Sequence, residues 1–270
     1  MTPDQPNISI KVDVANPGQF FACCGLLELA DRLWPSGEVL GRFIPRRFDR
    51  SSFHISAKLA FSTRDVIHGL LRSTRRPVDP YQIIMGSNGK PVTDPLKIAP
   101  VEFAEPTRLR ISWWLDEVAG QQSDFKTWSA HKTSHGLLDE LAAAVSISDV
   151  TDESLLQLRV GMTSRLGLDA RSSWNTLDTG FSPNDQNLPV DTYAATELLA
   201  AIGLETFRPA TDGEGFRYAS WSLPLPVGVA RAVASGCSGE FVDTRFRFHI
   251  RARGKFKSFT QASPLLGETR

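Results

Sequence analysis

Residues 7–34 read NISIKVDVANPGQFFACCGLLELADRLW, and this stretch decides how the fold begins. From Ile8 to Val14 apolar residues alternate with polar ones, which predicts a strand with one buried face. Asn16 is suited to cap a helix, and Pro17 is suited to its first position. The helix that follows is apolar almost all round, so we expect it to be buried on more than one side and to end before Pro35.

The next elements extend this start to strand, helix, strand, strand and helix. Strands are predicted at about residues 39–48 and 53–61 from their apolar patterns. Residues 62–65 resemble a capping box that opens a helix through about Leu71. This order is typical of a ferredoxin-like βαββα unit. Its closing strand is predicted in RLRISWW, residues 108–114, after a connection longer than compact domains usually tolerate without a function.

The second half is predicted to mix helices and strands. Helices are expected at residues 134–145 and 226–234, and in TYAATELLAAIG after a cap at Asp191. Gly203 is expected to follow the end of that capped helix. A long strand over about residues 241–256 is expected near the end of the chain.

With 270 residues, the chain can hold one large domain or two small ones. We predict an α+β fold in which residues 1–115 form the ferredoxin-like unit. Residues 116–270 form the mixed half, which is either a second unit or the remainder of the same domain. A hydrophobic content of 41% and a net charge of zero exclude an intrinsically disordered chain.

Acidic and basic residues balance, with 30 of each. This balance excludes a uniformly cationic protein that coats nucleic acid indiscriminately. The three cysteines have no zinc-site spacing and do not form a disulfide framework, so we expect a cytoplasmic protein. We also expect no secretory leader, no membrane span, no metal and no cofactor.

Positive charge concentrates in the last predicted strand. Because alternate side chains of a strand point to opposite faces, this strand predicts one packed face and one cationic row about 40 Å long. An exposed sheet face is normally polar, and cations protect edge strands, so a solvated face without a ligand is the alternative. The row comprises Arg245, Arg247, His249, Arg251, Arg253, Lys255 and Lys257.

A second basic segment runs from Arg42 to Arg76. Nine basic residues there accompany only Asp49 and Asp65, which gives a local net charge of +7. In the whole chain arginine outnumbers lysine by 22 to 8, and arginine favours bidentate phosphate contacts. Two basic clusters in a neutral chain predict a polarised surface that binds nucleic acid. The candidate contacts in this segment are Arg42, Arg46, Arg47 and Arg50.

Catalytic and metal-binding patterns are weak. His131 and His135 are four residues apart, but HKTSH lacks the glutamate of an HExxH zinc site. GSNGK at residues 86–90 lacks the spacing of a phosphate-binding P-loop. We therefore predict that the protein is not an enzyme. The rival interpretation is a nuclease that uses the two histidines with nearby carboxylates.

Three blocks of sequence resemble one known protein family. The first is VDVANPGQFFACCGLLELADRLW, the second is ISWWLDE with FKTWSAHKTS, and the third is LGLDARSSWNTLDTGFSPNDQ with TYAATELLAAIGLETFRP. In this order they resemble a small CRISPR-associated protein family of type I-U systems, now called I-G. Its members are labelled as variants of the effector complex's large subunit. The resemblance spans most of residues 12–209.

The resemblance implies a non-catalytic subunit of an RNA-guided, Cascade-type surveillance complex. Guide–target base pairing gives such complexes their specificity, while the proteins hold the nucleic-acid backbone. The implied partners are the CRISPR guide RNA, target DNA, other Cascade-type subunits and a recruited helicase-nuclease. Lys126 and Arg171 lie in the blocks and are candidate nucleic-acid contacts. Trp113, Trp114 and Trp128 are expected in the core or in a subunit interface.

Two positions in such a complex fit the sequence. The family label favours a large-subunit-like role, which includes recognition of the flanking motif. The ferredoxin-like start, and a length that is short for a large subunit, favour a RAMP-type subunit that binds the guide handle or forms the backbone. We favour the large-subunit-like role. A protein-only scaffold, whose basic faces meet acidic neighbouring subunits, is the alternative from another class.

Overall fold

The structure is a computed structural model, and it describes most of the chain. The backbone alone is described for Arg253 and Phe256. The described residues are 5–46, 50–79, 84–86, 89–92, 94–128, 132–172, 190–237, 239–253 and 256–265.

The chain begins with strand, helix, two strands and helix, as the sequence predicts. These elements are β1 (Ile8–Val12), α1 (Pro17–Leu33), β2 (Leu40–Ile44), β3 (Ser51–Ser56) and α2 (Thr63–Arg72). Short elements follow: β4 (Arg75–Pro77), η2 (Pro95–Lys97), β5 (Val101–Phe103), β6 (Leu109–Ile111), β7 (Leu115–Asp116) and β8 (Gln121–Gln122).

The second half carries three α-helices among short strands in the described residues. Its first elements are α3 (Ser134–Ala143), η3 (Ile147–Asp149), β9 (Val160–Met162), η4 (Ala170–Ser172), β10 (Val190–Thr192) and α5 (Ala194–Thr206). The remaining ones are β11 (Ala210–Thr211), β12 (Phe216–Ser220), β13 (Leu225–Pro226), α6 (Val227–Ala234), β14 (Thr244–Phe248), β15 (Ile250–Arg253), β16 (Phe256–Phe259) and β17 (Ser263–Pro264).

Side-chain caps set the starts of the first two helices. The side-chain oxygen of Asn16 accepts hydrogen bonds from the backbone N–H groups of Gly18 and Gln19 at the start of α1. Ser62 and Asp65 form a reciprocal capping box at the start of α2. Each cap satisfies backbone donors that have no partner within the helix, and both confirm the sequence prediction.

The main sheet, here called sheet A, has the order β1-β3-β2-β13 and is antiparallel. A third strand that lies between the first two is the arrangement of a ferredoxin-like start. The predicted closing strand is wrong: β6 pairs with β5 in a separate sheet of order β4-β5-β6. Leu109 and Ile111 of β6 are buried beside α5 instead of extending sheet A. The fold is therefore α+β.

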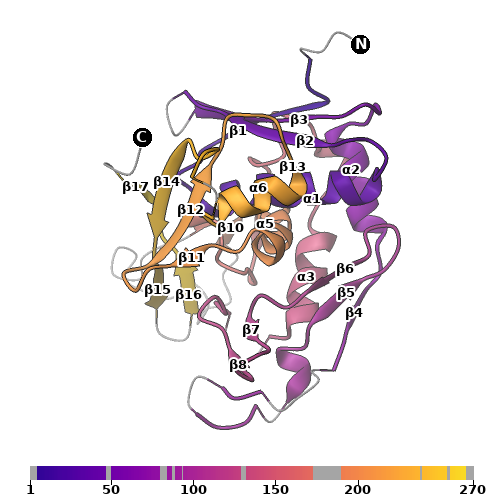
Figure 1. The fold of residues 1–270 in the computed structure, drawn as a ribbon. Coiled ribbons are helices and arrows are strands. Elements are labelled where there is room, and N and C mark those ends of the chain that lie inside the picture. The colour runs from indigo at the N-terminus through magenta and orange to yellow at the C-terminus, as the bar shows by residue number, and fades with distance from the viewer. Residues whose placement is uncertain are drawn as a thin grey trace.

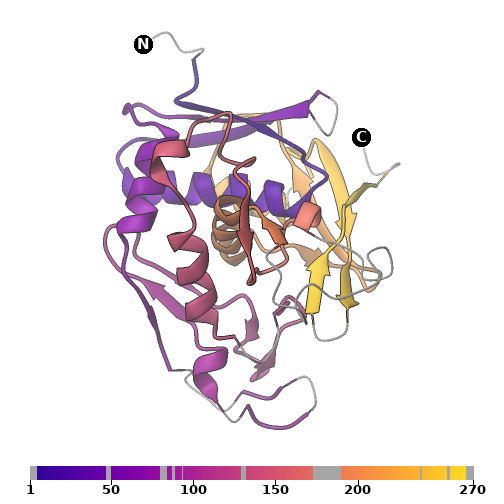
Figure 2. The same cartoon turned by 180° about the vertical axis from the view of Figure 1, so that it is seen from behind.

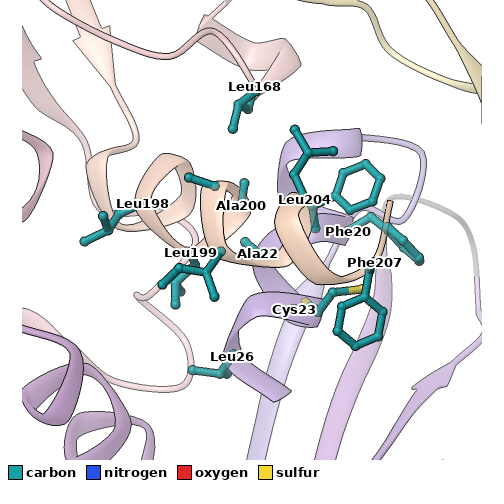
Figure 3. Packing of buried hydrophobic residues seen from close by; sticks show 14 of the residues in the cluster. Phe20, Ala22, Cys23, Leu26, Leu168, Leu198, Leu199, Ala200, Leu204 and Phe207 are labelled. Atoms are coloured by element: carbon teal, nitrogen blue, oxygen red, sulfur yellow. The ribbon is translucent and has the colours of Figure 1, made fainter. Parts of the chain in front are cut away.

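α1 lies against the inner face of sheet A, and α5 crosses α1 on the side away from that sheet (Figure 1 and Figure 2). Figure 3 shows Phe20 and Leu26 of α1 beside Leu199 and Leu204 of α5 in the centre of the core. The residues predicted to form two units share this core, because α5 packs on α1 and β13 extends sheet A.

Two glycines allow α1 and α5 to touch through their backbones. A Cβ atom on Gly203 would lie 1.9 Å from the carbonyl oxygen of Phe21, and one on Gly25 would lie 2.1 Å from that of Leu199. The prediction that Gly203 follows the end of its helix is wrong, because the residue lies inside α5. The predicted cap at Asp191 is also wrong, since that residue belongs to β10.

We expect Gly203→Ala to lower the free energy of unfolding by more than about 3 kcal/mol, because the added methyl forces the two helices apart. Gly228→Ala in α6 is the matched control, since a Cβ there meets nothing within 4 Å. We expect that control to be neutral or stabilising. Urea unfolding followed by circular dichroism measures both, and equal stability of the two variants contradicts the proposed helix contact.

A buried carboxylate connects α5 to the segment before η4. Glu197 is fully buried and accepts backbone hydrogen bonds from Leu166 (3.0 Å), Leu168 (3.1 Å) and Asp169 (3.0 Å). Asp169 in turn accepts a 2.7 Å hydrogen bond from the Asn16 side chain, so the starts of α1 and α5 are joined. Burial, supported by the Asp169 charge, raises the pKa of Glu197 to about 7.

Because the fold holds the proton of Glu197 more tightly than the unfolded chain does, stability from this group is complete below pH 4.5 and is lost as pH rises through about 7. We expect a decrease of up to about 3 kcal/mol over this range. Glu197→Gln should remove this pH dependence in urea unfolding, whereas exposed Glu153→Gln should retain it. The same pH dependence in Glu197→Gln contradicts the assignment.

The predicted long strand at residues 241–256 is wrong in its extent. The chain forms β14, breaks at His249, continues as β15 and then reverses into β16. β14 pairs with β12 and β17, whereas β15 pairs with β16 in a separate two-stranded ribbon. Phe246 and Phe248 are fully buried, so the predicted packed face is correct for β14. The cationic positions do not form one straight row.

Candidate nucleic-acid interface

The outer face of sheet A is open and cationic. Its inner face is closed by α1, with Ile10, Phe43 and Phe53 each at most 2% exposed. No described helix or strand covers the other side (Figure 1 and Figure 2). The outward positions of β1, β2 and β3 contain no carboxylate: they are Ser9, Lys11, Leu40, Arg42, Ile44, Ser52, His54 and Ser56. We call these eight positions the outer face.

The strand register gathers the basic side chains of the outer face. Arg42 on β2 lies directly opposite His54 on β3. Lys11 on β1 lies opposite Ser52, one step along the same face. Cβ atoms of opposite residues are typically about 5 Å apart, and diagonal neighbours are about 7–8 Å apart. His54 therefore neighbours Arg42 directly and Lys11 diagonally, and all three lie on the same face of the sheet.

Three other cations of the basic segment are neutralised. Lys58 pairs with Glu38, Arg75 with Asp139 at 2.6 Å and Arg76 with Glu102 at 2.7 Å. By contrast, no carboxylate of the described residues forms an ion pair with Lys11, Arg42 or Arg46. The outer face therefore keeps a positive charge that is not neutralised, whereas Lys58, Arg75 and Arg76 are neutralised by carboxylates.

The other predicted contacts of this segment flank the outer face. Arg46 follows β2 and is exposed, and Arg50 is exposed just before β3. Arg47 lies outside the described residues. Lys11 and His54 are the members that sequence reasoning missed. The alternation in β1 and β3 indicates that both side chains point away from the buried apolar face. Only the strand register shows that they lie on the same face as Arg42.

The protonation state of His54 responds to its surroundings on the outer face. Burial, followed by repulsion from Arg42 and Arg46, lowers its pKa, so the ring is neutral at pH 7. Its Nδ1 atom is buried and has no hydrogen-bond partner among the residues that the structure describes. Ser9 on β1 is its neighbour on the other side. A phosphate beside the ring would favour its protonated form.

The C-terminal cations have different environments from one another. Arg247 pairs with Asp212 at 2.6 Å and with Glu214 at 2.5 Å, so acidic residues between β11 and β12 neutralise it. Arg245 lines a cavity of about 250 Å³ together with Arg217. These acidic partners lie far away in the sequence, so only the folded protein neutralises Arg247.

The remaining cations of the row belong to the β15–β16 ribbon and do not share one face of it. Arg251 is exposed on β15 and lies opposite Ser258, whereas Lys257 is exposed on β16 and lies opposite Ala252. The reversal of the chain therefore places Arg251 and Lys257 on opposite faces of the ribbon. The side chain of Arg253 and the whole of Lys255 lie outside what the structure describes. The ribbon also lies well below sheet A in both Figure 1 and Figure 2.

Two of the predicted nucleic-acid contacts, Lys126 and Lys257, lie on neighbouring segments although they are far apart in sequence. The backbone N–H of Lys257 donates a 2.9 Å hydrogen bond to the carbonyl oxygen of Thr127, which places β16 beside Lys126. Lys126 donates a 2.8 Å hydrogen bond to the carbonyl of Trp128 and lies 5.0 Å from the centre of its ring. Burial, followed by repulsion from Lys257, lowers the pKa of Lys126 to about 8.

Arg171 has a structural environment. Its guanidinium holds buried Asp169 through two nitrogens and donates to the Leu156 carbonyl and the Gln157 side chain. It also lies 3.5 Å from the ring centre of Tyr193. Because protein acceptors occupy its donors, we assign Arg171 to anchoring this segment and not to the interface.

The tryptophans and His135 also serve the fold. Trp113, Trp114 and Trp128 are at most 4% exposed and pack edge-to-face, which confirms the core assignment. His135 contacts the Arg75 carbonyl at 2.9 Å and Asp139 at 3.1 Å, and His131 lies outside the described residues. Within the described ranges, no three His, Cys, Asp or Glu side chains form a group able to hold a metal ion.

The chain matches no protein-family model, and comparison with curated proteins and with solved structures finds no significant match. Among the described helices, none combines the length and apolarity that a membrane crossing requires.

We expect binding of single-stranded RNA to strengthen as pH falls from 7.5 to 5.5, because His54 gains a proton beside the bound phosphate. His54→Gln should remove most of this pH dependence, while exposed His68→Gln on α2 should leave it intact. Fluorescence anisotropy with a labelled ten-nucleotide RNA measures the affinities. An unchanged pH profile in His54→Gln contradicts this assignment.

Proposed function

We propose that this protein is a non-catalytic, cytoplasmic subunit of a type I-U (I-G)-like CRISPR surveillance complex, in which it binds guide RNA or target DNA. The observation that carries the proposal is the outer face of sheet A, which presents Lys11, Arg42 and His54 and has no carboxylate among its eight positions. The resemblance of the three sequence blocks supplies the proposed assembly and its other subunits. We favour a large-subunit-like role in it.

The composition of the outer face favours contact with the backbone over recognition of bases. The face offers two permanent cations and four serine or histidine donors, but apart from His54 it presents no aromatic ring for base stacking. Cationic and hydroxyl side chains bind phosphates and sugars without regard to sequence. Such binding suits a complex in which base pairing with the guide supplies the specificity.

A RAMP-type role in the same complex is the second candidate. The β1-β3-β2 order and the helix between the first two strands favour it, since they match the first part of a ferredoxin-like unit. The location of β6 in another sheet weighs against a complete unit. Both roles place nucleic acid on a basic surface, so the following experiment tests what they share.

The double variant Lys11→Gln/Arg42→Gln should bind a single-stranded RNA at least tenfold more weakly than the wild type, because two phosphate contacts are lost. The slope of log K against log salt should become shallower by about 1.4, since each contact with single-stranded nucleic acid contributes about 0.7. Lys58→Gln/Arg76→Gln is the matched control, because carboxylates already neutralise those cations. Fluorescence anisotropy at several salt concentrations measures both quantities.

Equal losses in the two double variants would show that only overall charge matters and would contradict the proposed surface. A protein-only scaffold predicts a different result: the purified wild-type protein would bind no RNA, while its contacts with neighbouring subunits would survive nuclease treatment. Metal-dependent cleavage of RNA or DNA by the purified protein, abolished by His131→Ala, would overturn the non-catalytic assignment.

A further inference from the structure

The segment 126–128 and strand β16 form a second cationic location, away from sheet A. The hydrogen bond from Lys257 to the Thr127 carbonyl joins the two segments. Lys126 extends along Trp128, which is 4% exposed, and uses one ammonium donor for the Trp128 carbonyl. An ammonium has three donors, so two remain available to a ligand.

The charges at this location are not balanced by the protein. Lys257 is the charged neighbour that acts on the Lys126 ammonium, and it repels it. Asp124 lies two residues before Lys126 and is exposed, yet within the described ranges neither lysine forms an ion pair with a carboxylate. Desolvation and like-charge repulsion both raise the free energy of a half-buried ammonium beside another ammonium. An anion that contacts both ammonium groups lowers that free energy. Such unfavourable pairs are characteristic of binding sites.

We propose that Lys126 and Lys257 form a subsite for one phosphate group of a nucleic-acid strand, and that Lys126 takes up a proton when the phosphate binds. The inference rests on the proposed function, and it adds a second contact point and a proton-linked step. Lys257, which is exposed, contacts the phosphate from the solvent side. Lys126 contributes its two remaining donors from the Trp128 side.

The direction of the proton transfer follows from the environment of Lys126. Its pKa is about 8 in the free protein, so at pH 8.5 much of the Lys126 amine is neutral. A phosphate contact should return the pKa towards the ordinary lysine value, so that binding draws a fraction of a proton from the buffer. His54 is neutral in the free protein at this pH, because burial and the neighbouring Arg42 lower its pKa.

Isothermal titration calorimetry at pH 8.5, repeated in buffers of different ionisation enthalpy, measures this uptake directly. The ligand is a ten-nucleotide uridine RNA, with and without a 5′-phosphate. Uptake with both RNAs indicates an internal phosphodiester, and uptake with the phosphorylated RNA alone indicates a terminal phosphate. Lys126→Gln should abolish the uptake, and Lys97→Gln, which removes a lysine near Asp94, should preserve it.

Lys257→Gln keeps the proposal testable if Lys126→Gln does not fold, because Lys257 is exposed. We expect this variant to bind RNA at least threefold more weakly and to take up less than half of the wild-type proton quantity. RNA binding by the wild type without proton uptake overturns the subsite and leaves the proposed function standing. Absence of any RNA binding by the wild type overturns both.

Discussion

The direct contact between the backbones of α1 and α5 is the constraint on which the rest of the structure depends. Gly25 and Gly203 are the residues that permit it, since a Cβ on either would lie within about 2 Å of a carbonyl oxygen of the other helix. The contact places α5 on one side of α1, so the opposite side of α1 faces sheet A (Figure 1). Hydrogen bonds from the 166–169 backbone to Glu197, and from Asn16 to Asp169, hold the starts of the two helices together.

This packing explains why one face of sheet A is available for a ligand. α1 and the surrounding core satisfy the apolar side of β1, β2 and β3, and no described element covers the other side. Ion pairs then determine which basic side chains keep their positive charge available for a ligand. Carboxylates neutralise Arg75, Arg76 and Arg247, whereas the outer face has cations and no carboxylate. A protein without net charge thereby presents a locally basic surface, and the neutral total excludes only a uniformly cationic binder.

Features that depend on neighbours in sequence were predictable. The alternation in β1, the Asn16 cap, the capping box at Ser62 and the burial of the tryptophans are local signals, and each is present. Features that depend on distant partners were not. The partner of β6, the acidic neighbours of Arg247 and the meeting of Lys126 with Lys257 all require the tertiary structure. The prediction for Gly203 is wrong because a glycine suits a helix end and a close helix crossing equally well. The cationic alternation near the C-terminus continues through a chain reversal that its pattern does not reveal.

Lysine acetylation of the wild-type protein, read by mass spectrometry with and without saturating single-stranded RNA, tests the central claim most directly. It needs no substitution and compares lysines within one molecule. Lys11 lies on the outer face, whereas Lys97 lies on η2, which is not part of sheet A. We predict that RNA slows acetylation of Lys11 at least fivefold and leaves that of Lys97 unchanged. Equal acetylation of Lys11 in the presence and absence of bound RNA would contradict the assignment of the outer face as the nucleic-acid interface.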